Sequence, residues 1–140
     1  MISINDKGET YQDIVMQSTN YNCGPAALAT VIKAQGIDCS EMELAQIAGT
    51  DESGTSMYGL IQAARKKGLG AWGMRLGLEN LKTNNIVFIK LNGSSHYSVI
   101  RKISNDKVYL ADPSLGEIKM KKDIFNQIYS GNALVIYKLK

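Results

Sequence analysis

The sequence predicts an α+β fold, in which a helical first half packs on a mainly antiparallel sheet formed by the second half. Two observations support this prediction. Apolar residues recur at helical spacing as far as Gly68, and apolar runs of strand length follow from there to the end. Helices first and strands second is the order typical of α+β domains, whereas α/β domains alternate the two.

Three helices are predicted from apolar residues three and four positions apart, and a glycine follows each of them. Glycine is the residue that most often ends a helix, because it adopts the left-handed conformation without strain. Ser40 and Ser56 are expected to cap the second and third helices, since a serine hydroxyl accepts the N–H groups of a first turn. The predicted ends are Gly36, Gly49 and Gly68.

Six strands are predicted in the second half. The run 86–91 is apolar and of strand length, and the strands 97–103 and 107–111 flank a polar turn at 104–106, as in a β-hairpin. A short helix is predicted over 122–129, ahead of the last strand. The other predicted strands are 71–76, 117–120 and 133–139.

Length and composition indicate one soluble globular domain over 1–140, with 44% apolar and 21% charged residues. The net charge of +3 is not gathered into a basic stripe, so we expect no nucleic-acid partner. We expect no signal peptide, because 1–17 is polar and mixed, and no run approaches the roughly 20 apolar residues of a membrane-spanning helix.

The two cysteines, Cys23 and Cys39, lie in very different sequence contexts. We therefore expect free thiols in a reducing compartment, and a cytoplasmic location, rather than a disulfide. No metal site and no cofactor are expected.

Cys23 is the candidate nucleophile because it precedes Gly24 and Pro25 at a predicted helix start. Proline fits a first helical turn, where its missing N–H costs nothing. The free N–H groups and dipole of a helix start favour negative charge, so the thiol pKa should be lowered there and the thiolate should be more reactive. Gly24 is expected to let the backbone approach a substrate carbonyl. A small buried apolar cysteine at a helix start is the alternative interpretation.

His96 is the candidate base, because it alone carries an imidazole in this chain and it opens a predicted strand after a polar turn. Asp112 ends the neighbouring predicted strand, so a hairpin would place it beside His96, where it could hold one imidazole tautomer. The alternatives are a histidine with a purely structural role and a turn aspartate before Pro113. Asp106, in the connecting turn, is a weaker candidate. Gln17 could donate a side-chain N–H to an oxyanion, together with the Cys23 backbone N–H.

Taken together, these motifs resemble the bacteriocin-processing cysteine peptidases, which are papain-like enzymes that cut after a double-glycine leader and often form the N-terminal domain of peptide-exporting ABC transporters. The resemblance covers nearly the whole chain, including the segment 54–69. It rests on Gln17, the Cys23–Ala27 motif, the His96–Ile100 run and Asp112–Pro113.

The resemblance implies a papain-like peptidase fold, with Cys23 as nucleophile, His96 as general base and acid, Asp112 as its orienter and Gln17 as the oxyanion donor. It also implies a thioester intermediate, a peptide or protein substrate and, as a partner, an ABC transporter at the cytoplasmic face of a membrane. Asn22 departs from the family, which often has aspartate at that position.

Members of the family inside transporters often carry a further cysteine shortly after the glycine of the motif, where this chain has Ala26 and Ala27. In this respect the motif is more similar to that of free-standing members of the wider group. Phytochelatin-synthase-like enzymes share a similar nucleophile motif and transfer the acyl group instead of hydrolysing it. Two alternatives therefore stand beside the peptidase. One is a papain-like acyl transferase or isopeptidase, and the other is a leader-binding module without catalysis.

Overall fold

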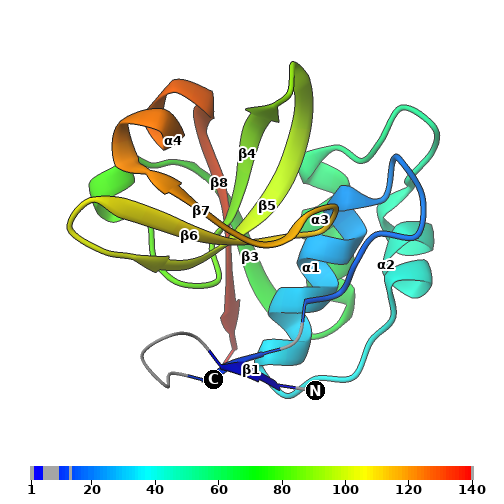
Figure 1. Ribbon diagram of the computed structural model, residues 1–140. Coiled ribbons are helices and arrows are strands. Elements are labelled where there is room, and N and C mark those ends of the chain that lie inside the picture. The colour runs from blue at the N-terminus through cyan, green and yellow to red at the C-terminus, as the bar shows by residue number, and fades with distance from the viewer. Residues whose placement is uncertain (1, 5–9, 13, 140) are drawn as a thin grey trace.

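The computed structural model describes residues 2–4, 10–12 and 14–139, and it has the predicted α+β fold. Three helices lie together on one side of an antiparallel sheet, and a short fourth helix, α4, lies on the other side (Figure 1). The helices are α1 (Cys23–Ala34), α2 (Glu41–Ala48), α3 (Met57–Lys66) and α4 (Lys122–Ile128), and a 3-10 turn, η1, spans Leu78–Asn80.

The sheet has six strands in the order β3-β8-β4-β5-β6-β7, and every neighbouring pair is antiparallel. A separate antiparallel pair is formed by β1 (Ile2–Ile4) and β2 (Thr10–Gln12). The six strands are β3 (Leu69–Arg75), β4 (Ile86–Leu91), β5 (Ser94–Ile103), β6 (Lys107–Asp112), β7 (Gly116–Lys121) and β8 (Tyr129–Lys138).

The predicted helix caps are confirmed. Ser40 Oγ accepts the Glu43 N–H at 3.1 Å at the start of α2, and Ser56 Oγ accepts the Gly59 N–H at 3.0 Å at the start of α3. Gly49 follows α2 in the left-handed conformation, with φ of 73°. These local signals are strong because each satisfies N–H or C=O groups that a helix end leaves free.

The predicted strands differ from the observed ones mainly at β8, which begins at Tyr129 instead of residue 133, and at β5, which begins at Ser94 instead of residue 97. The pairing of β4 with β8 shifts register between Val87 and Ile89, and Gly131 has a φ of 89°. Such an irregularity interrupts the alternation from which a strand is recognised. The pair β1–β2 lies in 1–17, a segment that is polar and mixed and so carries no strand pattern, and the short turn η1 is not predicted either.

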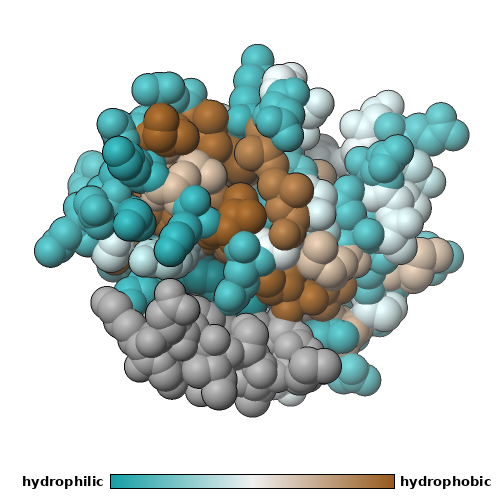
Figure 2. Space-filling model, viewed as in Figure 1, coloured by the Kyte–Doolittle hydropathy of each residue, from teal (hydrophilic) through white to brown (hydrophobic). Residues whose placement is uncertain are grey.

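Two apolar clusters fill the two faces of the sheet. The first lies between the sheet and α1–α3, and it includes Leu28, Leu60 and Val99, all fully buried. The second lies on the opposite face around Phe125 of α4. Figure 2 shows apolar side chains gathered around α4 and toward β4 on the side facing the viewer. The two clusters fix β4, β5 and β6 from both sides, and these strands support the site described below.

The contact between α2 and α3 requires a glycine at position 59. A Cβ on Gly59 would overlap the carbonyl oxygen of Ala48, the last residue of α2, and this neighbour is backbone. We expect Gly59→Ala to lower the free energy of unfolding by about 1–3 kcal/mol, because α2 and α3 must separate. The gain in helix propensity, about 1 kcal/mol, offsets only part of this cost. Urea unfolding followed by circular dichroism measures the change.

Gly73→Ala is the matched control, because a Cβ there would meet only the flexible end of Met57, at 3.1 Å. We expect this variant to lose less stability than Gly59→Ala. Equal losses in the two variants, or an unchanged Gly59→Ala protein, would show that the glycine is not required by the helix contact.

Candidate active site

The candidate site lies where β5 and β6 part. The two strands pair from Val99–Ala111 to Ile103–Val108, so in the described structure the first residues of β5 have no partner on the β6 side. The N-terminus of α1 lies at this opening, where the backbone N–H of Tyr97 helps to lower the pKa of the Cys23 thiol. The splayed hairpin therefore brings a helix start and two strand ends together.

Cys23 is the first residue of α1 and is partly exposed. Burial alone would raise the pKa of its thiol, but a hydrogen bond with His96 and the backbone N–H groups of Tyr97 and Gly24 stabilise the thiolate. The net effect is a lowered pKa. Cys23 is predicted at a helix start, and there an imidazole and two backbone N–H groups stabilise its thiolate.

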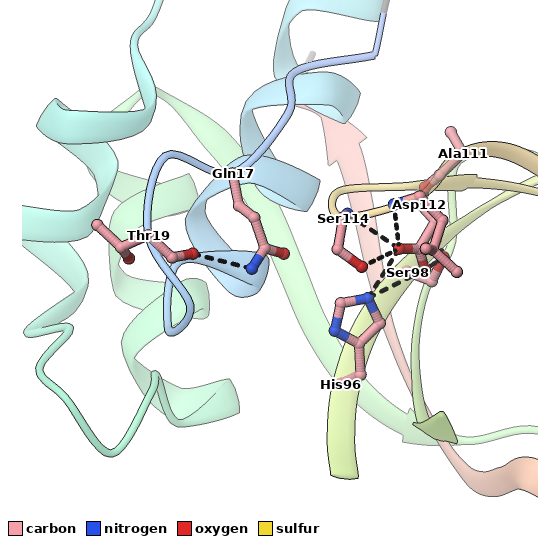
Figure 3. Close-up of polar contacts among 8 residues, drawn as sticks. Gln17, Thr19, His96, Ser98, Ala111, Asp112 and Ser114 are labelled. Atoms are coloured by element: carbon pink, nitrogen blue, oxygen red, sulfur yellow. Dashed lines mark hydrogen bonds and ion pairs between the residues drawn. The ribbon is translucent and has the colours of Figure 1, made fainter. Parts of the chain in front are cut away.

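His96 lies near the start of β5 with only 9% of its surface exposed. Its Nε2 atom lies 2.9 Å and 3.0 Å from the two carboxylate oxygens of Asp112 (Figure 3), which leaves Nδ1 for Cys23. Burial lowers the pKa of His96, yet the hydrogen bonds and charges of Asp112 and Cys23 outweigh it and raise the pKa to about 9. The arrangement favours an imidazolium next to a thiolate.

Asp112 ends β6 and is completely buried. Burial raises the pKa of its carboxyl, but the hydrogen bond and charge of His96, with further donors, lower it overall. Those donors are the Oγ of Ser98 at 2.9 Å, the N–H and Oγ of Ser114 at 3.0 Å and 2.9 Å, and the N–H of Leu115 at 3.1 Å. The carboxylate is therefore a buried anion whose charge is stabilised by hydrogen bonds from the protein.

The structure thus brings His96 and Asp112 together, as the hairpin argument predicted, and Cys23 interacts with the same imidazole. The alternative aspartate, Asp106, lies in the turn between β5 and β6, at the opposite end of the hairpin.

Gln17 joins this site through its backbone, since its N–H donates to the Pro113 carbonyl at 2.8 Å, directly after Asp112. Its side-chain Nε2 donates to the Thr19 carbonyl at 2.8 Å (Figure 3). An amide nitrogen carries two hydrogens, so one remains for another acceptor. The Oε1 atom is buried and finds no hydrogen-bond partner among the described residues.

Gly24 also serves the packing of α1, besides the approach to a substrate carbonyl that the sequence predicts. It is buried, and a Cβ on it would lie 3.3 Å from side-chain atoms of Thr55, Leu60 and Tyr97. The small residue therefore lets α1 pack closely on α3 and β5. The Tyr97 hydroxyl donates to the Thr55 carbonyl at 2.9 Å, and burial followed by the charge of Cys23 raises the pKa of Tyr97 to about 12.

Sequence reasoning missed Ser98, Ser114 and Tyr97. Tyr97 and Ser98 lie inside a predicted strand and in the His96–Ile100 run, and neither has an expected role of its own there. Ser114 follows an Asp-Pro pair, and the motif Asp-Pro-Ser is a known turn pattern in which an aspartate accepts nearby N–H groups. That pattern could have found Ser114, whereas nothing in the sequence relates Ser98 to Asp112.

Cys39 differs from Cys23 in its surroundings and in the pKa of its thiol. It is buried against the Ala29 carbonyl, and both cysteines are free thiols. Burial raises the pKa of the Cys39 thiol.

Among the described residues, no group of three or more His, Cys, Asp or Glu side chains is arranged to hold a metal ion. No helix in the described part of the chain is long and apolar enough to cross a membrane.

Comparison with solved structures supports the fold. The chain is similar to the peptidase domain of Streptococcus ComA, a bi-functional ABC transporter involved in a quorum sensing pathway, with a TM-score of 0.85 and 26% identity over 92% of this chain and 100% of that one. It is also similar to a double glycine motif protease from an AMS/PCAT transporter in complex with its leader peptide. That match has a TM-score of 0.81 and 23% identity over 99% of this chain and 93% of the other.

Comparison of sequences gives the family. A protein of Methanothermobacter thermautotrophicus, itself uncharacterized, is 55% identical over 123 residues, which make up 88% of this chain and 87% of that protein. The model of the peptidase C39 family matches residues 11–140, a range that includes Gln17, Cys23, His96 and Asp112. The chain therefore belongs to the peptidase C39 family.

Proposed function

We propose that this protein is a cysteine peptidase that cuts a peptide chain after a leader ending in two small residues of the Gly-Gly type. The observation that carries the proposal is the contact of His96 Nε2 with both oxygens of the buried Asp112 carboxylate, at 2.9 Å and 3.0 Å, with the other ring nitrogen left for Cys23. A base oriented by a third group and bonded to a thiol is the arrangement that nucleophilic catalysis needs.

The reaction begins with the Cys23 thiolate, which attacks the scissile carbonyl carbon and forms a tetrahedral oxyanion. The Cys23 backbone N–H and the second hydrogen of Gln17 Nε2 donate to that oxyanion. The C–N bond then breaks, and the His96 imidazolium gives its Nδ1 proton to the leaving amine, which leaves a thioester on Cys23. Water attacks the thioester with neutral His96 as base, and the thiolate and imidazolium return.

Asp112 keeps its negative charge throughout this sequence. It accepts the Nε2 hydrogen in both protonation states of the imidazole, so Nδ1 always faces the sulfur. The raised pKa of His96, about 9, keeps the ring protonated at neutral pH and ready to protonate the leaving group.

The leader specificity draws its support from two sources. The structural relatives are the peptidase domain of an ABC transporter and a double glycine motif protease bound to a leader peptide. A peptide in the opening would also pass close to the β4–β5 turn at Gly93 and the first two residues of β5, both serines, which offer little bulk. We include in the proposal a cytoplasmic role in peptide maturation, alone or with an ABC transporter.

Substitutions at Cys23, His96, Asp112 and Gln17 should reduce cleavage to different degrees. With a leader-bearing peptide as substrate, Cys23→Ala and His96→Ala should abolish cleavage. Gln17→Ala should slow the chemical step by roughly a hundredfold or more, the usual cost of one oxyanion donor. Asp112→Asn should keep partial activity, because an amide oxygen also accepts the imidazole N–H. Liquid chromatography with mass detection identifies the products, and circular dichroism confirms that each variant is folded.

Wild-type turnover by Cys23→Ala would contradict the assignment. The products also separate the alternatives. A hydrolysed peptide supports the peptidase, an acyl group transferred to an added amine supports a transferase or isopeptidase, and binding of the leader without any product supports a non-catalytic module.

The two residues before the cut should also determine the rate of cleavage. In a peptide series that varies only at these positions, Gly-Gly and Gly-Ala should be cleaved, and a branched residue at either position should mainly lower kcat/KM. The physical reason is steric exclusion of the larger side chain from the transition state. If Leu-Leu is cut as fast as Gly-Gly, the double-glycine specificity fails, although the Cys-His-Asp chemistry could still hold.

A further inference from the structure

Ser98 is a buried hydroxyl on an otherwise apolar part of β5. It is completely inaccessible to solvent. Its neighbours on the same face of the sheet are Val87, directly across the ladder, and Ile100, two residues further on, and both belong to the second apolar cluster. A valine or alanine would fill such a position without a polar cost, whereas a buried hydroxyl is unfavourable unless it is hydrogen-bonded. The hydroxyl therefore requires an explanation.

The partner of this hydroxyl is Asp112. Ser98 Oγ lies 2.9 Å from Oδ2 of the carboxylate and 3.4 Å from the Ala111 carbonyl oxygen, so its single hydrogen is best placed for the carboxylate (Figure 3). Ser98 and His96 are two residues apart on β5, and their side chains reach the same carboxylate from the same face of the sheet.

The two oxygens of Asp112 are not supported equally. Besides His96, Oδ1 accepts the N–H and the Oγ of Ser114 and the N–H of Leu115. The bonds to Oδ2 are those from His96 and from Ser98. Loss of the Ser114 hydroxyl would leave Oδ1 with two backbone donors besides His96. Loss of the Ser98 hydroxyl would leave Oδ2 with the His96 N–H alone, which Oδ2 shares with Oδ1.

We propose that Ser98 is a positioning residue for the reaction, whose hydroxyl holds Oδ2 of Asp112 against His96 and keeps the carboxylate in its anionic form. This inference rests on the proposed roles of Cys23, His96 and Asp112. Ser98 touches no reacting atom and acts through Asp112, which in turn holds the imidazole that faces the thiolate.

The expected effect is on the acid side of the pH profile. A donor to a carboxylate favours its charged form, so removal of the Ser98 hydroxyl raises the pH at which Asp112 takes up a proton. Once Asp112 is neutral, the imidazolium loses its counter-charge and is held less firmly against the sulfur, so it stabilises the Cys23 thiolate less well. The titratable groups that face this carboxylate are His96 on β5 and, through the imidazole, Cys23 on α1, while Tyr97 faces Cys23 from β5.

The test uses Ser98→Thr and Ser98→Val, which have nearly the same shape and differ in the hydroxyl. The rate of Cys23 alkylation by iodoacetamide is measured from pH 3 to pH 8 by mass spectrometry of tryptic peptides, with Cys39 as an internal reference thiol. We expect the acid midpoint of Ser98→Thr to stay near that of the wild type. The midpoint of Ser98→Val should rise by about one to two pH units, as the loss of one hydrogen bond to a charged group implies.

Two further variants keep the test decisive. Ser98→Ala removes the hydroxyl without adding bulk, and it should shift the midpoint as Ser98→Val does, even if the larger residues fold poorly. Ser114→Ala should shift it less, because two backbone donors remain on Oδ1. Equal midpoints for the Thr variant and for both hydroxyl-free variants, or a shift in Ser114→Ala as large as that in Ser98→Ala, would overturn the proposal.

Alkylation needs no peptide substrate, so this test is separate from the proposed cleavage. A protein that cuts no leader but shows the shift supports the role of Ser98 and contradicts the peptidase. A wild-type Cys23 that reacts no faster than Cys39 would remove the activated thiolate, and with it both the proposed chemistry and the role of Ser98.

Discussion

The burial of the Asp112 carboxylate is the constraint that orders the site. A charge with no solvent contact is unstable in a protein unless it is paired and hydrogen-bonded. Here an imidazole, two serine hydroxyls and two backbone N–H groups surround it. These groups come from two segments of the chain, the first part of β5 and the turn after β6. Satisfying one buried anion thus fixes the positions of His96 and of the turn that holds Gln17 through Pro113.

The topology supplies the second half of the arrangement. Because β5 and β6 pair only from Val99 and Ala111 onward, the strand ends diverge and leave room for the first turn of α1. Gly24 allows this turn to lie close to Tyr97, whose backbone N–H is then directed at the Cys23 sulfur. The helix start, the imidazole and the buried anion act in series, and each one stabilises the charge of its neighbour.

Much of this could be predicted from the sequence, because the signals are local. Ser40 and Ser56 cap helices in the way serines do anywhere, and Cys23 before Gly-Pro indicates a helix start. The hairpin across 104–106 was enough to place His96 beside Asp112 at the far end. In each case a few adjacent residues determine the geometry, and antiparallel pairing extends it over a short distance.

The parts that could not be predicted depend on contacts between distant residues. Ser98 has its role only because β5 and β6 meet at Asp112, and along the strand it is simply a serine. The packing of Gly24 on Leu60 joins α1 to α3, and the hydrogen bond from Gln17 to Thr19 depends on a loop conformation. The early start of β8 was hidden by the irregular backbone at Gly131.

The central claim, a thiolate–imidazolium pair held by Asp112, is tested most directly by titrating His96, since this is the only histidine in the chain. Nitrogen-15 NMR of the labelled protein reports the protonation of one imidazole without overlap. We predict a pKa of about 9 in the wild type. A lower value is expected in Cys23→Ala, because the thiolate is lost while Asp112 remains. A wild-type pKa near the unperturbed value of about 6.5, unchanged by Cys23→Ala, would contradict the ion pair.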